Sequence, residues 1–162
     1  MPAMNRIPDS PRATRAATGL LTLVAGCFGM SAHAGLGDST DSVARDRGVL
    51  HAQTETRTTT AAYDRHEFTT ASGTRVREYV SKSGKVFAVS WSGPSLPDLK
   101  TVLGSHYDAY LAAATAPHHN HHVLTISTPG LMLQNSRLPR GFTGRAHIPS
   151  LVPAGVSSAE LD

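Results

Sequence analysis

The chain has 162 residues, of which 40% are hydrophobic and 17% are charged. This composition is typical of a globular protein and is too apolar for a disordered chain, and the length allows one sizeable domain. With 14 Gly, 10 Pro and a single Cys, the chain is not a collagen-like repeat or a disulfide scaffold.

The first 34 residues have the pattern of a secretory signal peptide. A basic segment, residues 1–15, precedes the uncharged stretch Ala16–Met30, and the small-x-small sequence Ala32–Ala34 follows. We expect cleavage between Ala34 and Gly35. A retained membrane anchor is the alternative, but polar residues dilute the stretch and its apolar centre is short for a span of about 20 residues.

The segment Val24–Cys27 offers a second processing route, because it resembles a bacterial lipobox. In that route Cys27 would carry a lipid and anchor the protein to a membrane. The apolar run continues beyond Cys27 towards the site at Ala34, which favours cleavage there. We therefore predict a periplasmic or secreted protein, with a membrane-anchored lipoprotein as the alternative.

Cleavage after Ala34 would also change the charge of the protein. It would remove three arginines and one aspartate, lowering the formal charge of +3 by two, and would remove Cys27. A nearly neutral domain lacks the basic surface that nucleic-acid binding requires, so we expect no nucleic-acid partner and no thiol chemistry. No transmembrane segment is expected in the mature chain.

Residues 35–62 form a poorly specified lead-in to the core. We expect a short helix through Val43 and Leu50, capped by one of the polar residues 38–42. The Thr-rich segment Thr54–Thr60 predicts an exposed edge strand or a linker.

Residues 63–91 predict a three-stranded antiparallel meander with turns at Ser72–Gly73 and Ser83–Gly84. Three-residue loops lead to five expected cross-strand pairs: Phe68 with Val76, Glu67 with Arg77, His66 with Glu78, Val80 with Val86 and Tyr79 with Phe87. The last strand is apolar on both faces, with Val86 and Ala88 on one face and Phe87, Val89 and Trp91 on the other. Both faces of the sheet should therefore be covered.

A long amphipathic helix follows, beginning near Asp98 and ending before Pro117, with an apolar stripe from Leu99 to Ala114. Further strands are predicted at Val123–Thr128, Leu131–Asn135 and Phe142–Ile148, and residues 149–162 form an irregular tail. The fold class is therefore α+β: an antiparallel sheet of five to seven strands with one long helix packed on it. The core domain should span residues 63–148.

The His tract after the helix is the one segment that invites a metal. His118, His119, His121 and His122 have the imidazoles that suit Zn²⁺, Ni²⁺ or Cu²⁺. No carboxylate or third fixed ligand lies nearby in the sequence, so a solvated loop with adventitious metal binding is the competing interpretation.

No motif assembles a catalytic or cofactor site. His66-Glu67 lacks the second His of a zincin motif, and the chain has no Gly-x-Ser-x-Gly elbow and no phosphate loop. Glu67 and Glu78 are interpreted as surface residues with basic neighbours. The aromatic residues are expected in the core, with a ligand pocket between helix and sheet as the alternative; these residues are Tyr79, Trp91, Tyr107 and Tyr110.

Several motifs resemble an exported proteobacterial family, the domain of unknown function 2844. They are Arg77–Val80, Gly84–Pro94, Leu96–Leu99, Leu103–Tyr110, Gly141–Ala146 and Pro153–Val156. The resemblance covers residues 35–156 and includes the leader. It implies a cell-envelope protein of a Gram-negative bacterium and supplies no activity, cofactor or catalytic residue.

These observations predict a non-enzymatic domain that binds a protein partner or an envelope component. A periplasmic metal-binding protein that uses the His tract is the alternative. A small hydrolase, whose site would be assembled from residues distant in sequence, is a third hypothesis.

Overall fold

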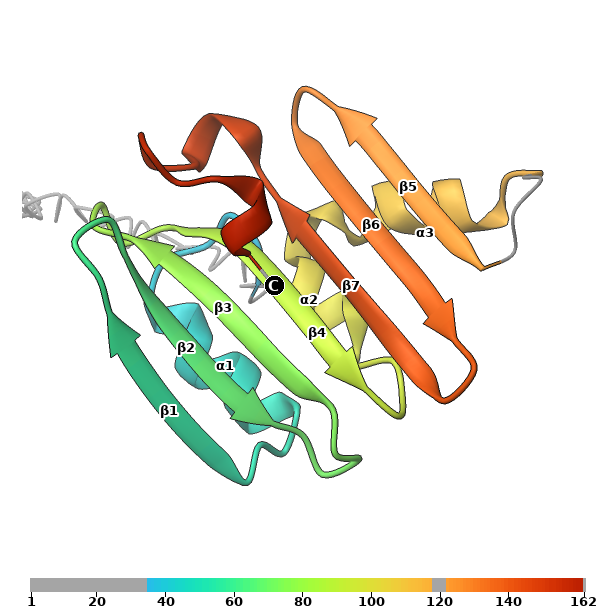
Figure 1. The fold of residues 1–162 in the computed structure, drawn as a ribbon, viewed down its shortest axis with the longest axis horizontal. Helices are drawn as coiled ribbons and strands as arrows, with labels where there is room; N and C mark the ends of the chain where they lie inside the picture. Colours follow the sequence, from blue (N-terminus) through green and yellow to red (C-terminus); the bar gives the residue numbers. More distant parts are fainter. Residues whose placement is uncertain (1–34, 118–121, 162) are drawn as a thin grey trace, which may run out of the picture. The chain divides into compact units, whose positions relative to one another are not determined.

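A computed structural model describes residues 35–117 and 122–161. They form a seven-stranded antiparallel sheet with strand order β1-β2-β3-β4-β7-β6-β5 (Figure 1). The strands are β1 (Thr54–Thr59), β2 (Tyr63–Thr69), β3 (Arg75–Ser81), β4 (Val86–Gly93), β5 (Val123–Thr128), β6 (Leu131–Leu138) and β7 (Gly141–His147). The helices are α1 (Asp41–Val49), α2 (Leu99–Leu103) and α3 (Tyr107–Thr115), with 3₁₀ turns η1 (Gly104–His106), η2 (Pro149–Leu151) and η3 (Ser158–Glu160). The α+β class is confirmed.

The first four strands follow one another as a meander. The first predicted register is confirmed, because Phe68 pairs with Val76, Glu67 with Arg77 and His66 with Glu78. The two turn glycines adopt the left-handed conformation that three-residue hairpin loops require, with φ values of 82° at Gly73 and 78° at Gly84. The Thr-rich segment forms β1, an exposed edge strand, and not a linker.

The second hairpin corrects one predicted pair. Val80 pairs with Val86 as expected, but Tyr79 pairs with Ala88 because Phe87 is an extra residue in a β-bulge. The bulge changes the faces of β4. Val86, Val89 and Trp91 belong to the larger core cluster, while Phe87 and Ala88 pack together in a second cluster. The strict alternation expected for this strand is therefore wrong.

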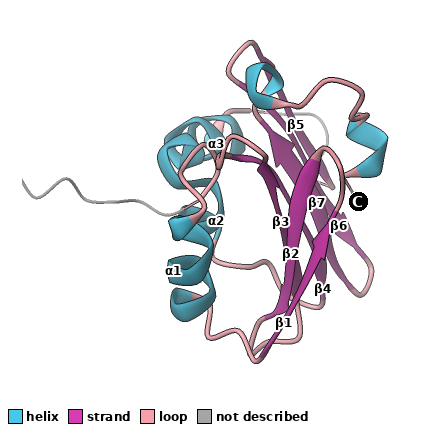
Figure 2. Ribbon diagram, turned by 90° about the vertical axis from the view of Figure 1, so that its left-hand side faces the viewer, coloured by secondary structure: helices cyan, strands magenta, loops and turns pink. Residues whose placement is uncertain are grey.

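All three helices cover one face of the sheet (Figure 2). The predicted long helix is confirmed as a continuous helical segment from α2 to α3, and it passes through η1, where Gly104 has a φ of 53°. The core lies between this layer and the sheet. Its side chains include Val76, Trp91, Val102 and Leu103. The short helix expected before β1 is α1, although the side chain of its N-cap residue, Thr40, makes no capping hydrogen bond.

The opposite face of the sheet is covered only in part. The C-terminal segment, residues 149–161, crosses one end of this face (Figures 1 and 2). The side chain of Leu161 is 1% exposed and packs in a cluster with Tyr79 and Phe87. The remaining part of the face is open. Among the described residues, no helix has the length and apolar character needed to cross a membrane.

Candidate functional site

The open part of the second face carries polar side chains from four adjacent strands. Side chains at every second position of a strand point to the same face. Arg75 pairs with Ser92, and Arg77 pairs with Ser90. These pairs begin two rows of side chains that continue across β7 and β6. In one row Ser90 pairs with Arg145, and Arg145 with Gln134. In the other row Ser92 pairs with Thr143, and Thr143 with Ser136.

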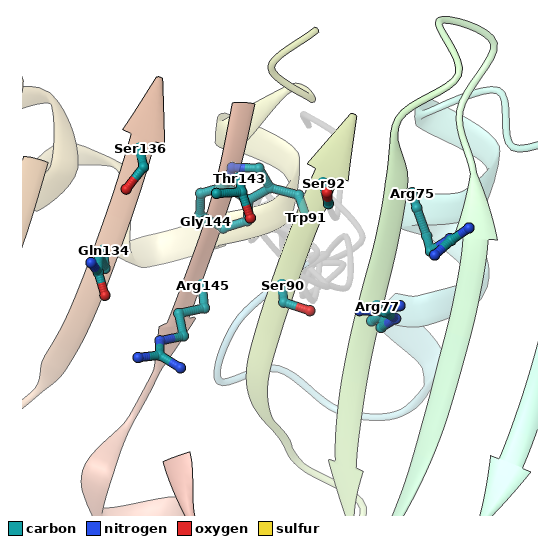
Figure 3. A pocket seen from close by; sticks show the side chains of 10 residues that line it. All are labelled: Arg75, Arg77, Ser90, Trp91, Ser92, Gln134, Ser136, Thr143, Gly144 and Arg145. Atoms are coloured by element: carbon teal, nitrogen blue, oxygen red, sulfur yellow. The ribbon is translucent and has the colours of Figure 1, made fainter. Parts of the chain in front are cut away.

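These rows line a hollow of about 510 Å³, called here the arginine trough (Figure 3). Its floor lies over the two central strands and has small side chains, Ser90, Ser92 and Thr143. Arg75 and Arg77 stand on one side, on β3, and Arg145 stands on the other, on β7. The trough therefore combines hydroxyl groups at its base with guanidinium groups at its sides.

A single carboxylate orients the two arginines of β3. Glu67 Oε2 accepts a hydrogen bond of 2.7 Å from Arg77 Nε, and Glu67 Oε1 lies 3.4 Å from Arg75 Nε. The hydrogen bond with Arg77 is the main reason why the pKa of Glu67 is lowered. A guanidinium has five N–H donors, and both contacts use Nε. Both terminal nitrogens of each arginine are left out of these two contacts and can serve a ligand.

On the other side of the trough, Arg145 connects the sheet to the C-terminal segment. Its Nη1 donates a hydrogen bond of 3.1 Å to the carbonyl of Ser158. A smaller hollow of about 130 Å³ adjoins here and contains His147. Burial and the charge of Arg145 both lower the pKa of His147. The C-terminal segment thus contacts one side of the trough through Arg145.

The floor of the trough depends on a glycine. Gly144 lies opposite Trp91, whose Nε1 donates a hydrogen bond of 3.2 Å to Asn135 Oδ1. A Cβ atom at position 144 would lie 2.4 Å from Trp91 Cζ2. Because a real Cβ cannot approach an indole ring so closely, the absence of a side chain at Gly144 allows the Trp91 ring to lie against β7.

A second group of polar residues is enclosed in the core, between α1 and the sheet. Asp46 and Glu78 are both fully buried, and among the described residues no donor reaches any of their four carboxyl oxygens. Burial raises the pKa of Asp46 to about 7. Burial also raises the pKa of Glu78 well above its usual value, and the nearby Asp46 raises it further. A hydrogen bond between the two carboxyl groups therefore requires that one of them carry a proton. The expectation that Glu78 is a surface residue is wrong.

The polar side chains of Ser42 and His66 are also buried in this enclosed region. His66 lies next to Glu78 on the adjoining strand, and its Nδ1 lies 3.2 Å from Glu55 Oε1. This contact is the main reason why the pKa of Glu55 is lowered. Ser42 Oγ and His66 Nε2 are buried without a partner in the described part of the chain. Neither side chain lines the arginine trough or the smaller hollow beside it, so the group is interpreted as part of the core and not as a substrate site.

The chain matches a known protein family over most of its length. The family described as Protein of unknown function (DUF2844) matches residues 32–161. The chain belongs to this DUF2844 family. The resemblance drawn from the motifs is thereby confirmed, and the match includes both the arginine trough and the buried carboxyl pair. Comparisons of this DUF2844 protein with curated proteins and with solved structures gave no significant match.

Most residues of the predicted metal and processing sites lie outside the described part of the DUF2844 chain. This holds for Cys27, Ala34, His118, His119 and His121. His122 is described and exposed, and its carbonyl accepts a hydrogen bond of 2.7 Å from the backbone N–H of Arg137. Within residues 35–117 and 122–161, no group of three or more His, Cys, Asp or Glu is arranged to hold a metal ion. Gly35 is buried against α2.

The arginine trough of this DUF2844 protein was missed by the sequence analysis. The pairing of Glu67 with Arg77 was predicted, and the spacing of Arg75 and Arg77 places both side chains on one face of a strand. That pattern alone gives a surface ion pair. The trough also needs Arg145 and Gln134. The pairing of β4 with β7 places Arg145 opposite Ser90, and the pairing of β7 with β6 adds Gln134. Because β4 and β7 are far apart in the sequence, no local pattern shows this arrangement.

Proposed function

We propose that this protein is a non-enzymatic domain that binds an anionic ligand in the arginine trough. The observation that carries the proposal is the placement of three arginines around a floor of hydroxyl groups, with Glu67 paired with the two arginines of β3. Guanidinium groups match the geometry of phosphate and carboxylate, and serine and threonine hydroxyls add hydrogen bonds. A guanidinium keeps its proton at any pH at which the protein is folded, so these residues bind and orient an anion but do not act as a base.

We also propose that the protein acts in the periplasm of a Gram-negative bacterium. This part of the proposal rests on the sequence of residues 1–34, which has the order of a signal peptide: basic segment, apolar segment, small-x-small site.

The test uses inorganic phosphate as the probe, titrated into the protein at constant ionic strength and followed by NMR chemical shifts. The variant is Arg75→Gln. Its side chain is 53% exposed, and Glu67 keeps its second partner, Arg77, so the variant leaves no unpaired buried acid. The loss of one charge-assisted contact should weaken phosphate binding about tenfold.

Arg57→Gln is the matched control. Arg57 is 57% exposed and pairs with Asp64, which likewise keeps a second partner, Lys82. Both variants remove one positive charge, but Arg57 lies on β1, away from the trough. Phosphate affinity should change less than twofold in Arg57→Gln. Equal weakening in both variants would show that binding follows net charge only and would contradict the proposal, as would the absence of saturable shifts at Ser90 and Thr143.

A further inference from the structure

A second hollow continues from the arginine trough along the same strands. It has a volume of about 550 Å³ and lies between the end of β4 and the turn from β6 to β7. Ser92 lines both hollows. The other side chains that line this second hollow are mainly apolar, namely Pro94, Leu138, Pro139 and Phe142, together with one charged side chain, Arg140. We call this hollow the apolar hollow.

Of the side chains that line the apolar hollow, Phe142 belongs by its register to the other face of the sheet, and Leu138 lies on the face of the trough. Leu138 lies two positions after Ser136 on β6, and residues two positions apart point to the same side of a strand. Two residues of a strand span about 7 Å, which is less than the length of an extended eight-carbon chain. The Leu138 side chain is 50% exposed, although a large apolar side chain loses free energy in water.

From this continuity we propose that the ligand is an amphiphilic anion. The inference rests on the proposed function: the arginine trough takes the anionic head group, and the apolar hollow takes an attached aliphatic chain. The number of guanidinium groups assigns the head-group end, because three arginines line the trough and one, Arg140, lines the apolar hollow among mainly apolar side chains. The occupant is a single small amphiphile, such as an alkyl phosphate, and not a membrane surface.

The experiment compares methyl phosphate with octyl phosphate below its micellar concentration, using the full domain and NMR titration. Octyl phosphate should bind at least about tenfold more tightly, since burial of two or three methylenes is sufficient for that gain. In Leu138→Ser, the gain of octyl over methyl phosphate should fall to about twofold. Leu111→Ser is the matched control, because Leu111 is 46% exposed on α3, on the other side of the sheet, and its substitution should leave the gain intact.

The possible results of these titrations distinguish failure of the amphiphile proposal from failure of the anion site. Equal affinity for methyl and octyl phosphate would overturn the amphiphile and leave the anion site standing. If neither phosphate binds, the anion site itself is wrong. If neutral octyl glucoside binds as tightly as octyl phosphate, the arginines do not select the ligand and the inference is overturned. It is also overturned if the protein binds phosphatidylglycerol vesicles and not octyl phosphate, since a membrane surface is then the occupant.

Discussion

At the scale of single residues, Asp46 and Glu78 are the most costly feature of the core. Two carboxyl groups without donors are tolerated in an apolar environment only when at least one is neutral. The neighbouring charges act in opposite directions: Arg45 lowers the pKa of Asp46 and Asp38 raises it, while Glu55 raises that of Glu78. Desolvation is the largest cause for both residues, so the proton is held by burial.

This arrangement predicts a stability that falls as the pH rises. In the unfolded chain Asp46 has its ordinary pKa near 4, and in the folded protein its pKa is about 7. Between these values the folded state holds more protons than the unfolded state, so the free energy of unfolding decreases from about pH 4 to about pH 7. Asp46→Asn should remove this loss at position 46 and be more stable than the wild type at pH 8, by about 4 kcal/mol for a pKa difference of about three units.

Urea unfolding of both proteins at several pH values measures this difference. His106 and His147 have pKa values lowered mainly by burial and contribute the opposite slope, so the informative quantity is the difference between variant and wild type at each pH. Asp41→Asn is the matched control, because Asp41 is an exposed acid on the same helix. If Asp46→Asn and wild type show parallel pH profiles, the carboxyl pair does not share a proton.

At the scale of elements, the C-terminal segment is part of the domain. The sequence of residues 149–162 predicts an irregular tail, and the segment has only short 3₁₀ turns. Yet Leu161 packs into the second core cluster with Tyr79, Phe87 and Ala88, and Ser158 accepts the hydrogen bond from Arg145. This contact connects the stability of the segment to one side of the arginine trough.

Leu161→Ala should therefore destabilise the protein by about 2–4 kcal/mol, which is typical when a buried leucine leaves a cavity. The free energy of unfolding in urea measures the change. Leu111→Ala, at an exposed position on α3, should cost less than about 1 kcal/mol. Equal small effects of the two substitutions would show that the C-terminal segment does not contribute to the folded core.

The elements themselves were largely predictable because their signals are local. The Ser-Gly turns determine a register across β2 and β3, and the apolar stripe from Leu99 determines a helix. The bulge at Phe87 was not predictable, because an extra residue in a strand changes no residue type. The order of the strands was also not predictable. The pairing of β4 with β7 encloses the trough, and it depends on long-range packing that no short pattern contains.

At the scale of the whole molecule, the sheet has two chemically different faces. Helices cover an apolar face, where Val76, Val89 and Trp91 form the core, and the other face carries arginines and hydroxyls from the same strands. A single strand such as β3 therefore contributes side chains to both faces. Val76 and Glu78 lie on the helix-covered face, and Arg75 and Arg77 lie on the other. The larger core cluster lies on the helix-covered face and the trough lies on the other, outside the smaller cluster around Leu161, so substitutions of the exposed trough arginines should leave the fold intact.

Processing at the N-terminus decides where such a protein acts. Gly35, the first residue after the predicted cleavage, is buried, and a Cβ atom there would lie 2.4 Å from the carbonyl oxygen of Thr101. The mature chain would thus begin with a residue packed on α2. Expressed with its leader in a Gram-negative host, the protein should be recovered from the periplasm, and mass spectrometry should find Gly35 at its N-terminus.

Two substitutions separate the possible routes. Cys27→Ser should leave this mass and location unchanged, because lipidation at Cys27 is not on the expected route. Ala34→Leu should block processing and accumulate the uncleaved chain, since the position before the cleaved bond must be small. A lipid-bearing Cys27 at the mature N-terminus would show the lipoprotein route instead. An intact leader on the wild-type protein would mean a retained anchor, and the arginine trough would then act at a membrane.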